Sequence, residues 1–378
     1  MIINDVDNLG QVFTREDIVN RIISLIQNQG RILEPSAGDG SFVNTLSDRD
    51  ITGIEIDNRF THSKVLNMDF FDFSINNKYP TIVGNPPYVE FSKIINSTKD
   101  KLDKTLFDNR SNLYLFFIEK CFRHLEPGGE LIFITPRDFI KLTASIKLNN
   151  LLYENGTITH WYDLGDQRLF GEFTPSCAIW RYVKGDYSRK TITNEGEKKF
   201  INMNGQLCFA NDEYSINLKD YADIRVGAVS GLDEVFTTES GNMEFVCSET
   251  RTNGKLRRMQ YGYSDILLPY KDKLLGRKIK TFTEKNWFEW GRSYFKSEKP
   301  RIYVNCKTRK NEPFFINDCK AYDGSVLAIF PKDGVDIIKL KDGLNSLNWR
   351  ELGFVSGSRY LFTQKTLENL KLPSSFFD

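Results

Sequence analysis

The chain has few residues of the kinds that bind metals, and they do not form a pattern. It contains six cysteines and three histidines in 378 residues, with no pair of cysteines in C-x-x-C spacing and no histidine placed to complete a zinc-ligand set. The scattered cysteines do not form a disulfide framework either. We therefore expect no metal site, and reduced thiols in a cytoplasmic protein.

Long hydrophobic runs and an excess of charge are also missing. The longest apolar runs, such as residues 113–118, fall far short of the roughly 20 residues that cross a bilayer. Residues 1–7 carry acids where an export signal needs a basic stretch and an apolar core. We expect no membrane segment and no export signal. The net charge of +1 does not by itself indicate a nucleic-acid partner.

What is present is an alternation of strand-like and helix-like segments in the first half of the chain. It predicts a largely parallel, Rossmann-like sheet with helices on both faces. One expected helix begins at a capping box formed by Thr14 and Asp17. The expected helices cover 15–28, 41–46, 112–125 and 137–154, and the expected strands cover 31–34, 51–56, 65–68, 81–83, 130–135, 158–164 and 177–183.

The second half has a different character. Residues 184–199 are polar and rich in Gly, Lys and Glu, which predicts a surface connection. Beyond about residue 220, short β-like runs, aromatic residues and Gly/Asn/Asp turns indicate a separate domain of mixed α+β or β-rich structure. A length of 378 residues suits two domains, and we predict them over 1–215 and 220–378.

A glycine-containing loop follows the first expected strand. The sequence Glu34-Pro35-Ser36-Ala37-Gly38-Asp39-Gly40 lies between this strand and a helix, at the edge where such sheets bind ligands. Gly38 and Gly40 would allow the backbone to approach a cofactor closely. An ordinary glycine turn has the same appearance, so both interpretations stay open at this point.

Acidic residues end the next two strands. Glu55, followed by Ile56, stands where a carboxylate accepts hydrogen bonds from ribose hydroxyls. Asp69 and Phe70 would offer a carboxylate and a ring to an adenine, although a surface acid beside core aromatics would look the same. The fingerprint G-x-G-x-x-G is absent because Val43 occupies the third position, which disfavours a nicotinamide cofactor.

The most specific motif is Asn85-Pro86-Pro87-Tyr88, directly after the strand over 81–83. Such a combination occurs by chance in roughly one chain per hundred of this length. A rigid turn is the alternative interpretation. The exocyclic amine of adenine is a poor nucleophile because its lone pair is delocalised into the ring. Hydrogen bonds to the Asn85 side chain and the Pro86 carbonyl would make this amine more nucleophilic, and Tyr88 would stack on the adenine ring. Positioning of the amine would then make a strong general base unnecessary.

A base inside a duplex cannot reach such a pocket, and the enzyme would have to flip it out and hold it between aromatic faces. Residues 169–175 supply two candidates for the second aromatic face, Phe170 and Phe173. Core packing is the alternative for each of them.

Together these segments resemble the gamma-order, N6-adenine-specific DNA methyltransferases of restriction-modification systems, in particular the TaqI methyltransferase family. The resemblance covers roughly the first 185 residues and implies a class I S-adenosylmethionine-dependent methyltransferase fold. It assigns catalysis to Asn85, Pro86, Pro87, Tyr88 and Phe170, with Phe173 as a second choice for stacking. The S-adenosylmethionine-binding residues that it implies are Phe13, Thr14, Glu34, Pro35, Ser36, Gly38, Gly40, Glu55, Ile56, Asp69, Phe70 and Asn85.

The resemblance also implies a partner and a role for the second domain. The partner is double-stranded DNA, residues 220–378 would recognise the target, and a cognate restriction endonuclease would act separately from a monomeric methyltransferase. Residues 271–310 interleave Lys and Arg with aromatics, as a DNA-contacting face would. We expect the polar, Lys-rich residues 89–110 to be a loop that orders on DNA or substrate.

Two other classes of function compete with this interpretation. An Asn-Pro-Pro-Tyr site also serves methyltransferases that act on RNA bases or on a protein glutamine amide. A non-catalytic DNA specificity subunit would keep the fold without the reaction. The sequence does not predict the DNA recognition site.

Overall fold

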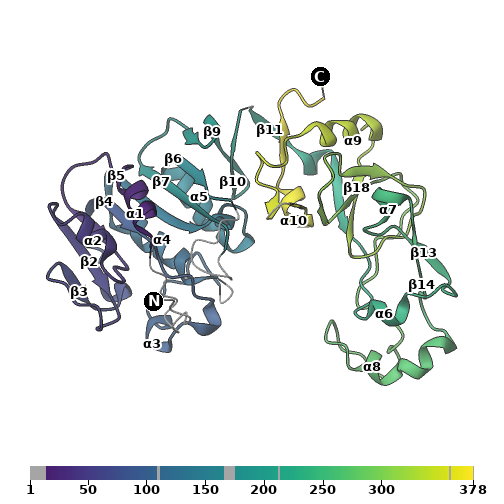
Figure 1. Cartoon of the computed structure of the whole chain (residues 1–378). Helices are drawn as coiled ribbons and strands as arrows, with labels where there is room; N and C mark the ends of the chain where they lie inside the picture. Colours follow the sequence, from purple (N-terminus) through teal and green to yellow (C-terminus); the bar gives the residue numbers. More distant parts are fainter. Residues whose placement is uncertain (1–13, 109–110, 166–174, 212, 357–358, 378) are drawn as a thin grey trace. The chain divides into compact units, whose positions relative to one another are not determined.

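The computed structural model describes residues 14–377 except 109–110, 166–174, 212 and 357–358. The chain divides into two compact units, Met1–Glu213 and Tyr214–Asp378, which are described separately (Figure 1).

The first unit is built on a ten-stranded sheet with the order β10-β9-β8-β6-β7-β5-β4-β1-β2-β3 in the described residues. Strands β1 to β5 are parallel neighbours, whereas β7 runs antiparallel between β5 and β6. The Rossmann-like sheet predicted from the sequence is confirmed. The strands are β1 Ile32–Glu34, β2 Ile51–Glu55, β3 Val65–Asn67, β4 Tyr79–Gly84, β5 Leu125–Pro136, β6 Gly156–Asp163, β7 Cys177–Lys184, β8 Lys190–Thr193, β9 Gly196–Met203 and β10 Gln206–Ala210.

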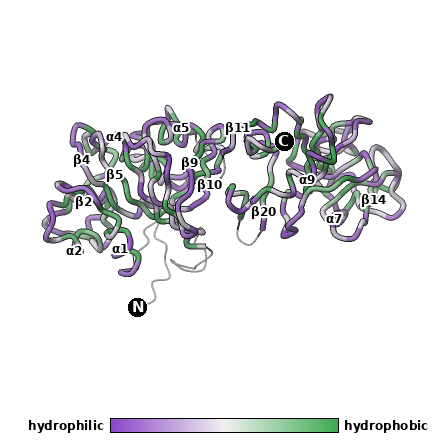
Figure 2. The backbone as a smooth tube through the Cα atoms, turned by 90° about the horizontal axis from the view of Figure 1, so that it is seen from above, coloured by the Kyte–Doolittle hydropathy of each residue, from purple (hydrophilic) through white to green (hydrophobic). Residues whose placement is uncertain are grey.

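Helices pack on both faces of this sheet because successive strand residues point to opposite sides. Ile32 and Ile132 pack with α1 and α2, whereas their neighbours Leu33 and Phe133 pack with α4 and α5. All four side chains are fully buried, and apolar residues concentrate in the same strands in Figure 2. The helices are α1 Glu16–Ile23, α2 Ser41–Thr45, α3 Asn96–Lys99, α4 Leu113–His124 and α5 Ile146–Asn155.

The first helix is shorter than expected and begins differently. It ends at Ile23 rather than near 28, and the backbone N–H groups of Gln27 and Asn28 donate to the buried Glu130 carboxylate at 3.0 and 2.9 Å. The capping box predicted at Thr14 is wrong, because α1 has no side-chain hydrogen bond at its N-terminus.

Two further segments differ from the prediction. Residues 184–199 are not a surface connection: β8 pairs with β6, and β9 pairs with β8. Thr191 and Phe200 are buried, whereas their neighbours Lys190 and Lys199 are exposed, as in a strand with one buried face. The prediction failed because most residues of the segment are polar, which obscures this alternation in the sequence. Short 3-10 turns replace the start of the helix expected over 137–154, and α5 begins only at Ile146.

The second unit is mixed and rich in short strands, as predicted. Its largest sheet has the order β12-β18-β15-β17 and is antiparallel throughout. The strands are β11 Tyr214–Asn217, β12 Ala222–Val226, β13 Met243–Phe245, β14 Arg257–Met259, β15 Ile302–Asn305, β16 Lys307–Thr308, β17 Phe314–Ile316, β18 Val326–Pro331, β19 Val355–Ser356, β20 Arg359–Leu361 and β21 Lys371–Pro373. The helices are α6 Asp233–Phe236, α7 Thr250–Asn253, α8 Lys271–Leu275, α9 Ile337–Ser346 and α10 Gln364–Glu368.

Candidate active site

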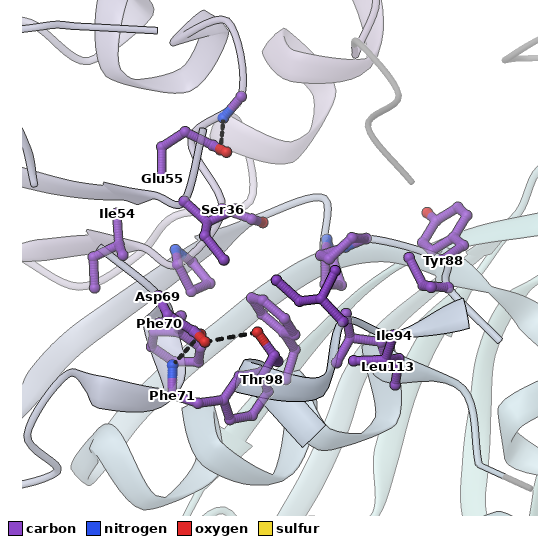
Figure 3. Close-up of a pocket in the computed structure, with 18 of the residues that line it drawn as sticks. Ser36, Ile54, Glu55, Asp69, Phe70, Phe71, Tyr88, Ile94, Thr98 and Leu113 are labelled. Carbon is purple, nitrogen blue, oxygen red and sulfur yellow. Dashed lines mark hydrogen bonds between the residues drawn. The ribbon is translucent and has the colours of Figure 1, made fainter. Parts of the chain in front are cut away.

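One pocket lies at the carboxyl ends of β1, β2, β3 and β4. Strand β1 pairs with both β2 and β4, so the loops after β1 and β4 meet where the strand order reverses, which is where open α/β sheets bind ligands. The pocket has an empty volume of about 880 Å³, part of which is open to solvent. Its lining residues are Pro35, Ser36, Gly38, Ile54, Glu55, Ile56, Met68, Asp69, Phe70, Phe71, Asn85, Pro86, Pro87, Tyr88, Val89, Ile94, Ile95, Thr98, Leu113 and Phe117 (Figure 3).

The glycine loop and Glu55 are joined directly. The Gly38 backbone N–H donates to Glu55 Oε2 at 2.7 Å, and the Asp57 N–H donates to Glu55 Oε1 at 2.9 Å. Glu55 is only 5% exposed, so these bonds fix the carboxylate at the edge of the pocket. Gly38 and Gly40 have φ of +53° and +81°, a conformation that favours glycine.

Asp69 and Phe70 lie on the opposite side of the pocket from Tyr88 in Figure 3. Asp69 accepts hydrogen bonds from the Phe71 backbone N–H at 2.9 Å and from the Thr98 hydroxyl at 2.7 Å. Phe70 is 2% exposed and stacks on Phe117, with 5.1 Å between ring centroids. The sequence analysis assigned the Asp69 carboxylate to an adenine amine. Through its bond from Thr98, this carboxylate also holds α3 in place.

The amide of Asn85 is held at both ends. Its Nδ2 donates to Thr14 Oγ1 at 3.1 Å, and its Oδ1 accepts from the Tyr88 hydroxyl at 2.7 Å. The Ser36 hydroxyl in the glycine loop donates to the Asn85 backbone carbonyl at 3.2 Å. The catalytic motif after β4 and the loop after β1 are thus hydrogen-bonded to each other.

Tyr88 is a neutral hydrogen-bond donor. Its hydroxyl lies 2.7 Å from Asn85 Oδ1 and 3.0 Å from the Ile134 carbonyl, so one proton serves two acceptors. Burial, and then the nearby Cys177 thiol, raise the pKa of Tyr88 well above its ordinary value. The hydroxyl therefore keeps its proton at physiological pH.

The charged residues that line the pocket have one sign, although Lys101, outside the lining, pairs with Asp69 at 3.2 Å. The lining contains two acids, Glu55 and Asp69, and no Lys, Arg or His. Glu34, beside it on β1, is 1% exposed, and its Oε2 has no hydrogen-bond partner in the described part of the chain. Burial raises the pKa of Glu34, and the negative charges of Asp39 and Glu55 raise it further.

The described part of segment 89–110 is mostly irregular, as predicted, but it is not uniformly polar, and its ordering on DNA or substrate stays a prediction. Its described residues include α3, and Ile94, Ile95 and Thr98 line the pocket. Ile94 and Thr98 are each 5% exposed. Sequence reasoning missed them, although the apolar pair Ile94-Ile95 inside a Lys-rich stretch was an available signal.

The predicted site residues thus fall into three groups. Thr14, Glu34 and Gly40 lie next to the pocket without lining it. Phe13, Phe170 and Phe173 lie outside the described residues. Those that line the pocket are Pro35, Ser36, Gly38, Glu55, Ile56, Asp69, Phe70, Asn85, Pro86, Pro87 and Tyr88.

Part of the interleaved segment 271–310 belongs to the core of the second unit. Trp287, Trp290 and Tyr303 are at most 5% exposed, so these three rings are not available to a ligand. Arg277, 8% exposed, donates to the backbone carbonyls of Leu274, Ser230, Trp287 and Glu289. Most lysines of the segment are exposed, and contact of this segment with DNA stays a prediction.

In the described part of the chain, no helix is long and apolar enough to cross a membrane. No group of three or more His, Cys, Asp or Glu side chains within that part could hold a metal ion.

Comparisons with known proteins agree on one family. Residues 17–170 match the family model described as Eco57I restriction-modification methylase. The chain is 32% identical over 189 residues to the type II methyltransferase M.HincII of Haemophilus influenzae, covering 47% of this chain and 38% of that protein. It is 31% identical over 198 residues to the type II methyltransferase M.TthHB8I of Thermus thermophilus, covering 47% and 46%. The chain thus matches less than half the length of either relative.

Among solved structures, the restriction-modification enzyme MmeI in complex with DNA is similar with a TM-score of 0.61 at 13% identity, covering 92% of this chain and 63% of that one. A likeness at this identity shows the fold. The strand order, with β7 antiparallel, is that of class I S-adenosylmethionine-dependent methyltransferases, and S-adenosylmethionine is the cofactor of this class. The narrower resemblance to gamma-order enzymes of the TaqI type stays a prediction. Residues 17–170 are thus similar to the Eco57I restriction-modification methylase family.

Proposed function

We propose that this chain is a DNA methyltransferase that transfers the methyl group of S-adenosylmethionine to the N6 amine of a flipped-out adenine in duplex DNA. One observation carries the proposal. Asn85 lines the pocket, its side-chain amide is oriented by Thr14 and Tyr88, and its backbone carbonyl accepts a hydrogen bond from Ser36 of the glycine loop. A hydrogen-bonding amide beside a cofactor pocket is the arrangement that methylation of an amine needs.

The pocket fits S-adenosylmethionine better than a dinucleotide. A dinucleotide carries a diphosphate, which needs cations or many N–H donors, and the described lining has no cationic side chain. S-adenosylmethionine carries no phosphate and bears positive charge on its sulfonium and ammonium groups. Glu55 would hold the ribose and Asp69 the adenine amine, while the unpaired Oε2 of Glu34 beside the loop suits a cationic cofactor.

Asn85 and Pro86 would act on the target amine. When bound, the cofactor supplies an electrophilic methyl group on a sulfonium that leaves as a neutral thioether. A carboxamide oxygen has two lone pairs, so Asn85 Oδ1 can accept from the base while keeping its bond from Tyr88. Together with the Pro86 carbonyl, it would fix the amine and localise its lone pair. Phe170 would supply the second stacking face.

The similarity to type II methyltransferases supports DNA as the substrate. We further propose that residues 1–215 bind the cofactor and catalyse the reaction, and that residues 220–378 recognise the DNA target. The chain would act as a monomer in a restriction-modification system, with a cognate restriction endonuclease as a separate protein.

The test is transfer of labelled methyl groups from S-adenosylmethionine to duplex DNA, RNA and protein offered in parallel. We expect label in DNA alone, recovered as N6-methyladenine after digestion to nucleosides. Label recovered as N4-methylcytosine would refute the choice of base, and label in RNA or protein alone would refute the substrate. Asn85→Ala should bind the cofactor and lose transfer. DNA binding without transfer by the unchanged chain would indicate a specificity subunit instead.

A further inference from the structure

A cleft in the second unit is lined by cations without a single acid. It has an empty volume of about 740 Å³, part of which is open to solvent, and its lining includes Lys307, Arg309, Lys310 and Arg359. Three of the other four lining residues carry hydroxyl groups, and the fourth is Asn305. Four positive side chains in one concavity create a field that favours an anionic ligand.

The β pairing brings like charges together. Strands β16 and β20 are antiparallel, with Lys307 opposite Leu361 and Thr308 opposite Tyr360. Arg309 and Lys310 follow β16 directly, and Arg359 begins β20, so the cations reach the cleft from two neighbouring strands.

Nearby acids do not neutralise the cleft. Within the described residues, Lys307, Lys310 and Arg359 have no carboxylate within 4.0 Å. Two acids close to the lining residues in sequence pair elsewhere: Glu312 lies 3.9 Å from Arg251, and Glu249 lies 3.7 Å from Lys255.

The cleft also has a buried hydrogen-bond acceptor. Asn305, at the end of β15, is 6% exposed, and its Nδ2 donates to the Ser248 carbonyl at 2.8 Å. Its Oδ1 is buried and has no partner in the described part of the chain. Because this oxygen is buried, the ligand contacts in the cleft come from its exposed cations, which suit anionic oxygens such as those of a nucleic acid backbone.

We propose that this cleft binds the sugar-phosphate backbone of duplex DNA through Lys307, Lys310 and Arg359. The inference rests on the proposed function, because it names a place where that DNA is held. Phosphate contacts position a duplex without reading its sequence. The cleft therefore contributes to the affinity for DNA, and other residues recognise the target base.

The test measures how DNA affinity depends on salt. Each lysine that neutralises a phosphate adds about 0.9 to the slope of log affinity against log salt concentration. The full chain with K307A/K310A should lose about 1.8 of this slope for a labelled duplex, and K307R/K310R should restore it. S-adenosylmethionine affinity should not change, since the pocket after β1 contains neither lysine.

The matched control is K280A/K299A, which removes the same charge from the same unit. These lysines lie 3.0 Å from Glu289 and 3.3 Å from Asp333, so they are already paired. We expect less than half of the slope change seen for the cleft pair. Equal changes in both pairs, or an unchanged slope with K307A/K310A, would overturn the proposal. A larger loss for duplex RNA than for DNA would overturn the choice of DNA.

The outcomes separate the two proposals. DNA binding and methylation by the unchanged chain, with no effect of K307A/K310A, would refute the cleft alone. DNA binding that depends on the cleft, without any methyl transfer, would refute the proposed function alone. No DNA binding by the unchanged chain would refute both.

Discussion

Replacing Tyr88 by Phe tests whether the Tyr88 hydroxyl orients the Asn85 amide. The ring stays, so stacking on a base would be kept, while the hydroxyl bond to Asn85 Oδ1 and its alternative bond to the Ile134 carbonyl are lost. The Tyr88 hydroxyl proton is shared by two acceptors, and such a hydrogen bond makes a net contribution of about 1 kcal/mol to the orientation of the Asn85 amide. If the orientation matters in the transition state, the rate constant for transfer should fall about fivefold.

The assay is single-turnover methylation of duplex DNA at saturating S-adenosylmethionine, with cofactor affinity measured separately. We expect a slower transfer step and an unchanged cofactor dissociation constant. Tyr114→Phe is the matched control, because its ring packs edge-on against Tyr88 at 5.9 Å and its hydroxyl has no hydrogen bond within the described residues. A rate for Y88F equal to that of Y114F would contradict the orienting role.

Other predictions concern stability and packing. Arg181→Met should destabilise the first unit by about 3–5 kcal/mol in urea unfolding, because Arg181 Nε lies 2.7 Å from the fully buried carboxylate of Glu130; a loss below 1 kcal/mol would contradict this. Burial lowers the pKa of Lys120 to about 8, so the unfolded chain binds more protons between that value and 10.5. Stability should therefore rise with pH through this window, relative to K120M, and a flat difference would argue against it. Gly53→Ala would place a Cβ 2.8 Å from the Val65 side chain of β3. This overpacking should lower both the stability and the cofactor affinity measured by calorimetry, whereas an unchanged affinity would show that β3 can move.

Much of the first unit could be predicted because its signals are local. The strands before Glu34, Gly84 and Pro136 are short apolar runs, and turn residues end them. Adjacent parallel strands bring their carboxyl ends to one edge, so the sequence also indicated that Glu55 and Asn85 face the same pocket. These inferences need only neighbouring residues and the rules of parallel sheets.

The errors arose where distant residues decide the structure. The conformation of the segment after α1 is fixed by the Glu130 carboxylate, which is 103 positions away from Gln27 in sequence. Trp290 belongs to the segment predicted to contact DNA, yet its ring is buried and stacks on Phe245 at 5.0 Å between centroids. Composition shows which residues could contact DNA, but burial shows which of them are available.

The Glu130 carboxylate has a consequence for how the first unit assembles. It accepts hydrogen bonds from Gln27, Asn28, Thr81 and Arg181, which lie 103, 102, 49 and 51 positions away in sequence. A charge at this position is tolerable only when these donors are present, and contacts between distant residues form slowly because of their loop-closure entropy. Glu130 thus joins three segments that are distant in sequence, and its carboxylate becomes fully paired only when all three lie against β5.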